Sequence, residues 1–509
     1  MENEKIEEGS FLNKNNPNVL PILALLLVVG LAIFVTGRCS LGANKDLDTK
    51  QLSSASVSSP GNDVGKNPPP NPSDEWIRTY GGNKGDFGEA IIKTSDGGYI
   101  AIGSADLGNR NSDFYVVKMD DKGDVTCPTC WQKTYGTTTH EYLNSIVEVD
   151  DGYVLAGFTS NSGQEDYLVI KITKLGDLQW QRTFGANDRR EFGHRVIKTS
   201  DGGYAVIGGD VPIGAGVSRL WFIKLDSGGI KLWDKVYGNA RGIDEIESGN
   251  LEETSYGYII GSTTYVNKGG DFWVLKIDSS GNILKEVVIG KASPSNETLI
   301  DIHQTSDGGY ITAGVTTDSS PGALTSGWAV KFSADLGVVW QKAYGLINTP
   351  TFSAEQEFRM VREVFDGYVF AGSILAPSVT TGVNNYDYWL VKTDFNGDTG
   401  YSNSFWQKTY GTPEQDHLEF MSLTPNGFVM AGWTQKPPKT SNNYDLMLIK
   451  IKGPGSFPCI VRTSLGLQAF VTNALTGGAL SYALPTALSA MAGPISQTNA
   501  NGIRADLCN

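Results

Sequence analysis

Acidic residues return at one place in a repeating pattern, and they are the first side chains in this sequence that could support chemistry. In each copy an acid begins the run of residues that follows a short loop, in most copies rich in Gly. The positions are Asp86, Glu141, Glu191, Asp244, Glu297, Glu357 and Asp416, with Glu357 the best match in the sixth copy. Carboxylate oxygens suit hard cations, so a ring of them could bind Ca²⁺ or a basic ligand. Alternatively, each carboxylate accepts N–H hydrogen bonds in its own turn and recurs because the unit recurs.

A second acid begins the Lys-bearing run of five copies. These residues are Asp113, Asp166, Asp271, Asp387 and Asp445. Elsewhere, the motif DFNGD (394–398) resembles part of a calcium loop, but the Glu that should end such a loop is missing. We therefore interpret DFNGD as a hairpin turn. We expect no cofactor, and Ca²⁺ at the acidic ring is the one alternative.

The cysteines predict two disulfides. Cys127 and Cys130 form a CPTC motif, and Cys459 and Cys508 bracket the C-terminal tail. Pairing within each set fits an oxidising compartment. The alternatives for CPTC are half of a zinc site or a redox pair. No second CxxC and no nearby His completes a zinc site, and no βαβ pattern surrounds the motif.

Composition argues against several classes of function. The net charge is −14 and the pI is about 4.9, with no basic run, so we expect no nucleic-acid partner. The four His residues belong to no recognisable triad or HExxH motif, and no Gly-rich phosphate loop is present. A glycosidase with paired carboxylates remains an alternative, although the sequence does not single out a pair.

The elements that position these residues follow from a repeat that begins at Trp76. Seven copies lie between Trp76 and Lys452, and each contains four short runs rich in Val, Ile, Tyr, Phe and Trp. In the first copy the runs are WIRTY, EAIIKT, YIAIG and DFYVVKM. Such runs, bounded by Gly and Asp turns, are typical of strands, and a helical period is absent. The sequence therefore predicts an all-β, seven-bladed β-propeller with four-stranded antiparallel blades over residues 76–452.

Turn lengths predict which runs form one blade. The K·D··G turn before each Trp run is mostly short, so the runs on either side of it should be antiparallel neighbours. A blade then contains the second, third and fourth runs of one copy and the Trp run of the next. The run at Trp76 is left over and should close the last blade. In this register the acid-bearing run is innermost, which would place the acidic ring at the mouth of the central channel.

The remaining segments indicate a membrane anchor. Residues 1–18 form a short acidic tail, and residues 19–37 are apolar and uncharged, long enough to span a bilayer as one helix. A cleaved signal peptide is the alternative. Residues 38–75, rich in Ser and Pro, predict a flexible stalk. Residues 453–509 leave the repeat pattern and form a C-terminal extension. With the disulfides, these features predict a single-pass membrane protein whose propeller is extracytoplasmic.

The pattern W···YGG···DGGY··AG···K·D··G resembles the tandem repeats of uncharacterised secreted or surface-anchored propeller proteins of archaea and bacteria. It is more distantly similar to pyrroloquinoline-quinone propellers, in which D··TG···W ends a blade. The resemblance covers residues 76–452 and implies the fold, but propellers host many activities. A quinone enzyme would have vicinal cysteines, whereas two residues separate Cys127 from Cys130.

We therefore expect a binding or scaffold module for a surface protein or glycan. The alternative is a carbohydrate-active or quinone-type enzyme on the same scaffold.

Overall fold

The computed structural model describes residues 75–452 and 467–471, apart from 83–84, 107–111, 138, 162, 215–217, 239–248, 266–268, 291–294, 319–324, 347–354, 378–383, 400–405, 413 and 436–442. The predicted tail, anchor and all but the last residue of the stalk (1–74) lie outside the described residues, as do Asp244, Cys459 and Cys508. In the part of the chain that is described, no helix is long and apolar enough to cross a membrane.

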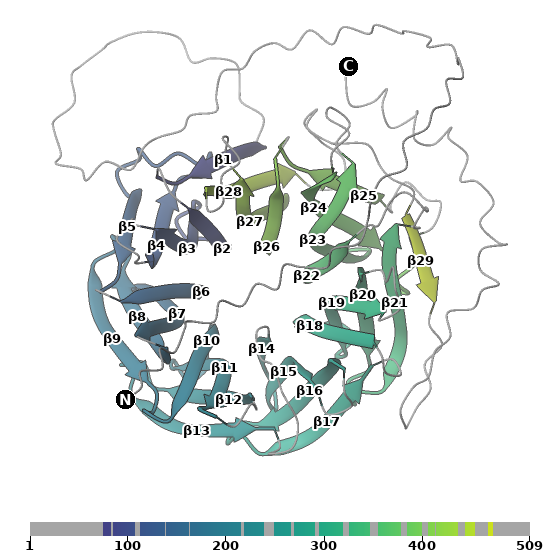
Figure 1. The fold of residues 1–509 in the computed structure, drawn as a ribbon, viewed down its shortest axis with the longest axis horizontal. Coiled ribbons are helices and arrows are strands. Elements are labelled where there is room, and N and C mark those ends of the chain that lie inside the picture. The colour runs from purple at the N-terminus through teal and green to yellow at the C-terminus, as the bar shows by residue number, and fades with distance from the viewer. Residues whose placement is uncertain are drawn as a thin grey trace, which may run out of the picture. The chain divides into compact units, whose positions relative to one another are not determined.

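Seven antiparallel sheets are arranged around a central axis, each with one strand near the axis and one at the rim (Figure 1). We number them as blades 1 to 7 in chain order. Blades 1 to 6 are built from consecutive strands. Blade 7 takes its outermost strand from the start of the repeats, because Trp76 pairs with Lys450 and Tyr80 with Leu446. The predicted seven-bladed, all-β architecture and its strand-exchange closure are confirmed.

Blades 1 to 4 run from the innermost to the outermost strand in chain order. Blade 1 contains β2 (Asp86–Lys93), β3 (Tyr99–Asp106), β4 (Ser112–Met119) and β5 (Trp131–Tyr135). Blade 2 contains β6 (His140–Val149), β7 (Gly152–Asn161), β8 (Gln164–Thr173) and β9 (Leu178–Phe184). Blade 3 contains β10 (Arg189–Lys198), β11 (Tyr204–Pro212), β12 (Arg219–Leu225) and β13 (Lys231–Tyr237). Blade 4 contains β14 (Asn250–Thr254), β15 (Gly257–Thr264), β16 (Asp271–Asp278) and β17 (Ile283–Ile289).

Blades 5 to 7 complete the ring. Blade 5 contains β18 (Ser295–Gln304), β19 (Tyr310–Asp318), β20 (Thr325–Phe332) and β21 (Val338–Leu346), and β29 (Leu467–Val471) pairs with β21 as a fifth strand. Blade 6 contains β22 (Gln356–Val364), β23 (Gly367–Pro377), β24 (Asn384–Thr393) and β25 (Trp406–Tyr410). Blade 7 contains β26 (Asp416–Thr424), β27 (Gly427–Gln435), β28 (Tyr444–Lys452) and β1 (Trp76–Tyr80).

The recurring Tyr, Trp and Lys residues stabilise the blades. The Tyr of each DGGY or DGY motif is buried in the core, as Tyr99 and Tyr310 illustrate. The Trp on three of the outermost strands donates a hydrogen bond to a turn of the next blade, for example from Trp131 Nε1 to the Lys174 carbonyl oxygen at 3.0 Å. The buried Lys118 forms an ion pair with Asp96 of its own blade at 2.8 Å. The repeat motif therefore encodes packing within and between blades.

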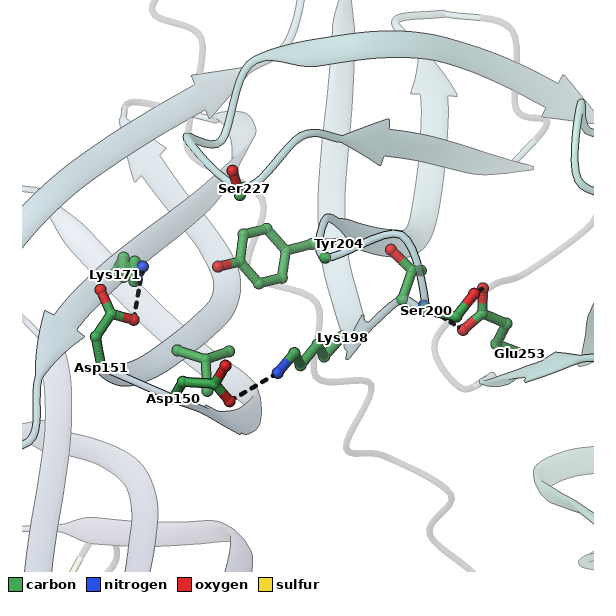
Figure 2. Close-up of a pocket in the computed structure, with 11 residues that line it drawn as sticks. Asp150, Asp151, Lys171, Lys198, Ser200, Tyr204, Ser227 and Glu253 are labelled. Carbon is green, nitrogen blue, oxygen red and sulfur yellow. Dashed lines mark hydrogen bonds and ion pairs between the residues drawn. The ribbon is translucent and has the colours of Figure 1, made fainter.

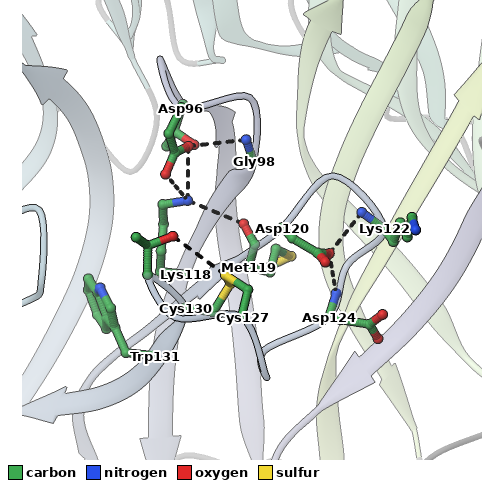
Figure 3. Close-up of a disulfide and its surroundings, with 12 residues drawn as sticks. Asp96, Gly98, Lys118, Met119, Asp120, Lys122, Asp124, Cys127, Cys130 and Trp131 are labelled. Carbon is green, nitrogen blue, oxygen red and sulfur yellow. Dashed lines mark hydrogen bonds and ion pairs between the residues drawn. A yellow bond between two sulfur atoms is a disulfide. The ribbon is translucent and has the colours of Figure 1, made fainter. Parts of the chain in front are cut away.

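The two faces of the ring differ in the connections that they carry. We call the side at which β2 begins and β3 ends, with its equivalents in other blades, the loop face. The opposite side, where β2 ends and β3 begins, is the turn face. Antiparallel pairing also places the β4–β5 connection on the turn face. This connection contains the disulfide between Cys127 and Cys130, whose Cα atoms are 4.9 Å apart (Figure 3). The first predicted disulfide is thus present.

A β-bulge interrupts the innermost strand of six blades. In blade 1 the pairing register shifts between Gly88 and Ala90, so that Glu89 is an extra residue. The equivalent residues of the other blades are Asn144, His194, Ile300, Arg359 and Glu419. Because a bulge changes the direction of side chains in a strand, it decides which groups face the channel.

Candidate ligand-binding site at the channel mouth

Five acids of the predicted ring are equivalent in register. Asp86, Glu141, Glu191, Glu297 and Asp416 each begin or nearly begin an innermost strand, and none is more than 2% exposed. Four of them accept a backbone hydrogen bond from the preceding loop; for example, Thr137 N donates to Glu141 at 3.1 Å and Ala186 N donates to Glu191 at 3.2 Å. These contacts correspond to the turn-stabilising alternative. The ligand-binding role of the ring stays a prediction.

The sixth position of the ring needs a correction. The pairing of β22 with β23 aligns Gln356, not Glu357, with the acids of the other blades. Gln356 is 1% exposed, whereas the Glu357 side chain is 23% exposed and forms an ion pair. Comparison of the repeats in the sequence missed Gln356 because the run QEF contains two adjacent polar residues. Only the pairing register before the β-bulge shows which of the two matches the acids of the other blades.

The five equivalent acids lie in the seams between blades, where each meets an acid of the preceding blade. Asp86 Oδ2 and Asp445 Oδ1 lie 2.7 Å and 2.0 Å from the point that a Cβ on Gly81 would occupy. Asp271 and Glu297 flank Gly290 in the same way. The five pairs join Asp445 to Asp86, Asp113 to Glu141, Asp166 to Glu191, Asp271 to Glu297 and Asp387 to Asp416. The Gly that follows the outermost strand therefore leaves space for two carboxyl groups.

The seam between blades 5 and 6 replaces this pair with neutral groups. Gln356 Oε1 and Ser326 Oγ lie 2.3 Å and 3.0 Å from the Cβ position of Gly345. In the acidic seams, burial followed by the neighbouring carboxylate Asp166 raises the pKa of Glu191 to about 7. Burial is the largest cause at Asp416 as well, where Asp387 adds to a pKa of about 7. The seam acids are thus positioned to share protons, and within the described residues no group of three or more His, Cys, Asp or Glu side chains could hold a metal ion.

Three carboxyl groups and one guanidinium group meet beside the channel, on the innermost strands of blades 6, 7 and 1. Arg359 forms ion pairs with Glu357 at 3.0 Å and with Glu419 at 2.9 Å. Glu89 on β2 lies close enough to both Glu419 and Arg359 to respond to their charges. We call Glu89, Glu357, Arg359 and Glu419 the charged cluster. Three of its members occupy equivalent bulge positions, which explains how residues from three blades converge.

The charged cluster has unusual acid–base properties. Burial, followed by the Glu419 charge, raises the pKa of Glu89 to about 8, and Arg359 only partly opposes this shift. Burial also raises the pKa of Glu419. The side chains of Arg359, Glu357 and Glu419 keep 31%, 23% and 17% of their surface exposed, so a ligand in the channel mouth can reach them. Partly exposed carboxyl groups with perturbed pKa values are typical of functional sites.

Aromatic rings adjoin the charged cluster on the loop face. His417 stacks on Trp433 with centroids 4.1 Å apart, and Tyr386 lies 4.1 Å from His417 on the other side. Tyr444 lies 4.8 Å from Trp433 and 5.0 Å from Phe87. We call these five residues the aromatic cluster; all are partly exposed. A hydrogen bond from Trp433 to Glu419 joins the two clusters.

A shorter row of rings occupies blades 2 and 3 on the same face. Tyr142 stacks on Phe158 with centroids 4.9 Å apart, and Phe158 contacts Phe192 at 5.2 Å. The bulge residue here is Asn144, which donates to the Gly193 carbonyl oxygen at 2.7 Å. The carboxyl and guanidinium groups found beside the aromatic cluster are therefore not repeated at this bulge.

A groove of 580 Å³ lies on the turn face between blades 2 and 3 (Figure 2). Its charged groups already have partners: Lys171 pairs with Asp151 and Lys198 with Asp150, both at 2.9 Å. Glu253 accepts hydrogen bonds from Ser200. Equivalent Ser–Glu contacts link Ser95 to Glu148 and Ser306 to Glu363. The groove is thus a repeated feature of blade packing, and the channel mouth is the stronger candidate site.

Comparison with known proteins adds little to this geometry. No protein-family model and no curated protein matches the chain. Trypanosoma rangeli sialidase in complex with the inhibitor DANA is 11% identical, with a TM-score of 0.39 over 74% of this chain and 56% of that chain. This chain thus spans about half the length of the sialidase. Sqt1 from Chaetomium thermophilum is 9% identical, with a TM-score of 0.40 over 74% of this chain and 98% of that chain. The Vanderwaltozyma polyspora Nup133 β-propeller domain is 11% identical, with a TM-score of 0.37 over 72% of this chain and 94% of that chain. Such similarities carry no argument about function.

Among the described members of the predicted ring, only Glu357 belongs to the charged cluster. Sequence reasoning missed Glu89, Arg359 and Glu419, because the third residue after the ring position is not constant between the copies. A signal was nevertheless present. Charged residues occupy that position in copies 1, 4, 6 and 7, and the predicted ring closure makes copies 1, 6 and 7 neighbours.

Proposed function

We propose that this chain is a membrane-anchored, extracytoplasmic binding module whose propeller recognises a glycan at the channel mouth. The observation that carries the proposal is the aromatic cluster beside the charged cluster. Sugar rings present C–H groups on their faces, which pack on aromatic rings, and hydroxyl groups at their edges, which hydrogen-bond to carboxylates and guanidinium groups. The partly exposed Trp433 and Tyr444 supply the first kind of contact, and Arg359 with Glu357 the second.

The cellular placement follows from the sequence. Residues 19–37 provide the anchor and residues 38–75 the stalk that would carry the propeller away from the membrane. The Cys127–Cys130 disulfide supports an oxidising environment, since disulfides are rare in reducing compartments. A surface protein is the alternative partner, because aromatic residues also serve as anchors in protein interfaces.

A glycan array probed with the full-length chain in detergent tests the proposal. We expect a defined set of glycans to be retained, and we expect Trp433→Ala to abolish retention. Phe158→Ala is the matched control, because Phe158 occupies the equivalent place in blade 2. If neither the parent chain nor Phe158→Ala retained any glycan, glycan recognition would be contradicted.

The second candidate is glycoside hydrolysis, favoured by one observation. Burial and then the Glu419 charge raise the pKa of Glu89 to about 8, and Arg359 forms an ion pair with Glu357. Glu89 would protonate the leaving oxygen as the glycosidic C–O bond breaks, while Glu357 takes a proton from the water that attacks the anomeric carbon. Release of reducing sugar that disappears in Glu89→Gln would support this candidate. A quinone-type enzyme has no such support, because Cys127 and Cys130 lie on the turn face.

A further inference from the structure

The charged cluster contains more negative than positive groups. Arg359 directs Nε to Glu357 and Nη1 to Glu419, so its guanidinium group is shared between two carboxylates. No hydrogen bond or ion pair from the described residues reaches the carboxyl group of Glu89. One carboxyl group of the cluster is therefore available to a cation from outside.

The surroundings of Glu89 contain no second positive charge within the described residues. Glu419 on β26 and Arg359 on β22 are the charged groups that face it. From β6, the equivalent residue is the neutral Asn144, which is bonded to Gly193. Burial lowers the pKa of His417 to about 4, so this ring is uncharged at neutral pH and does not repel a cation.

We propose that the channel mouth binds a glycan carrying an ammonium group, with the cation placed between Glu89 and Glu419 and the sugar rings on Trp433 and Tyr444. This inference rests on the proposed glycan-binding function and adds the ligand's charge. The raised pKa of Glu89 supports it, because a proton there neutralises a carboxyl group that the ligand's cation would neutralise instead. Aromatic faces also attract cations electrostatically, so His417 and Trp433 favour the same ligand.

Binding of the cation should release the proton held by Glu89. The affinity for a ligand of fixed charge should then rise as the pH increases towards 8, by up to about tenfold per pH unit. For an ordinary amine, affinity should fall again above the pKa of the amine, because the ligand loses its charge. These two profiles separate cation recognition from general glycan binding.

Calorimetric titrations of the full-length chain in detergent test the inference with three hexasaccharides that share one backbone. These are chitohexaose with free amino groups, its N-acetylated form and its N,N,N-trimethylated form. We expect the trimethylated form, whose charge does not depend on pH, to bind at least tenfold more tightly than the N-acetylated form at pH 8. We also expect the affinity of the trimethylated form to fall about tenfold for each pH unit between 8 and 6.

Two variants assign the effect to the site. Glu89→Gln should remove both the preference for the cation and the pH dependence. Asp188→Asn removes an exposed acid from blade 3 and should change neither. Equal binding of all three forms, unaffected by Glu89→Gln, would overturn the inference and leave the proposed function intact. The inference would also be overturned if none of the three hexasaccharides bound, or if only a lysine-rich peptide used as a competitor bound. If no glycan on the array were retained, both the inference and the proposed function would be overturned.

Discussion

Asp387 of blade 6 and Asp416 of blade 7 face each other across a buried seam. Their oxygens Oδ1 and Oδ2 lie 2.3 Å and 2.7 Å from the point where a Cβ on Gly411 would be, and both residues are at most 2% exposed. Two ionised carboxylates this close in a buried site repel each other, so one of them holds a proton more tightly than in water. Because four other seams contain an equivalent pair, the ring as a whole should respond to pH.

Stability should decrease as the pH rises from 5 to 8. Burial, aided by neighbouring acids, raises the pKa of Asp416 and Glu191 to about 7 in the folded chain. The proton on such a carboxyl group stabilises the folded chain relative to the state in which the group is ionised. This stabilisation is complete at pH values below about 4, the pKa of the group in the unfolded chain. This contribution disappears as the pH passes 7. Urea denaturation at pH 5, 6, 7 and 8 measures the trend. A flat profile, or a more stable protein at pH 8, would show that the seams are not proton-linked.

The neutral seam between blades 5 and 6 allows an acid pair to be added where the chain has none. Ser326→Asp combined with Gln356→Glu should install an acid pair between blades 5 and 6. We expect a loss of about 1–3 kcal/mol at pH 8, where both acids ionise, and a much smaller loss at pH 5. Ser326→Asn controls for the added volume. Equal losses at both pH values would attribute the effect to packing rather than charge.

Gly411 should tolerate no side chain. A Cβ there would lie 2.3 Å from Asp387 Oδ1 and 2.7 Å from Asp416 Oδ2, which forces the carboxyl pair apart. Gly411→Ala should lower the free energy of unfolding by about 1–3 kcal/mol, as overpacking does in other cores. Gly228→Ala is the control, because its Cβ would approach only Asp226, at 3.4 Å. Thermal unfolding compares the two variants, and similar stabilities would argue against the crowded seam.

Ring closure should depend on Trp76. This side chain is 8% exposed, donates from Nε1 to the Asp121 carbonyl oxygen at 3.1 Å, and is the first residue of the strand that completes blade 7. Trp76→Ala should cost about 3–5 kcal/mol, the range for a buried Trp. Trp131 is half-buried and occupies the equivalent place in blade 1, so Trp131→Ala should lower the free energy of unfolding by less. Denaturation curves that rank the two variants in the opposite order would contradict this view of closure.

The sequence was sufficient to predict the blades because each level of the repeat agrees with the others. The strand-forming runs, the short K·D··G turns and the unpaired run at Trp76 all specified one register, which the pairing of β1 with β28 confirms. Glu357 shows where this reasoning failed. A β-bulge adds a residue to the innermost strand, so the simple alternation of side chains no longer predicts what faces the channel. Arg359 and Glu419 lie on such bulges, and their convergence depends on contacts between blades that no single repeat contains.

Calorimetry with N-acetylated chitohexaose tests the central claim most directly, because it measures glycan binding at the channel mouth without assuming catalysis or a charged ligand. The full-length chain, Trp433→Ala and Phe158→Ala would be titrated under one set of conditions. We expect the parent chain and Phe158→Ala to bind alike, and Trp433→Ala to bind at least tenfold more weakly, a loss of about 1.4 kcal/mol or more. Binding that survives in Trp433→Ala but is lost in Phe158→Ala would place the glycan on blades 2 and 3 and contradict the site described above.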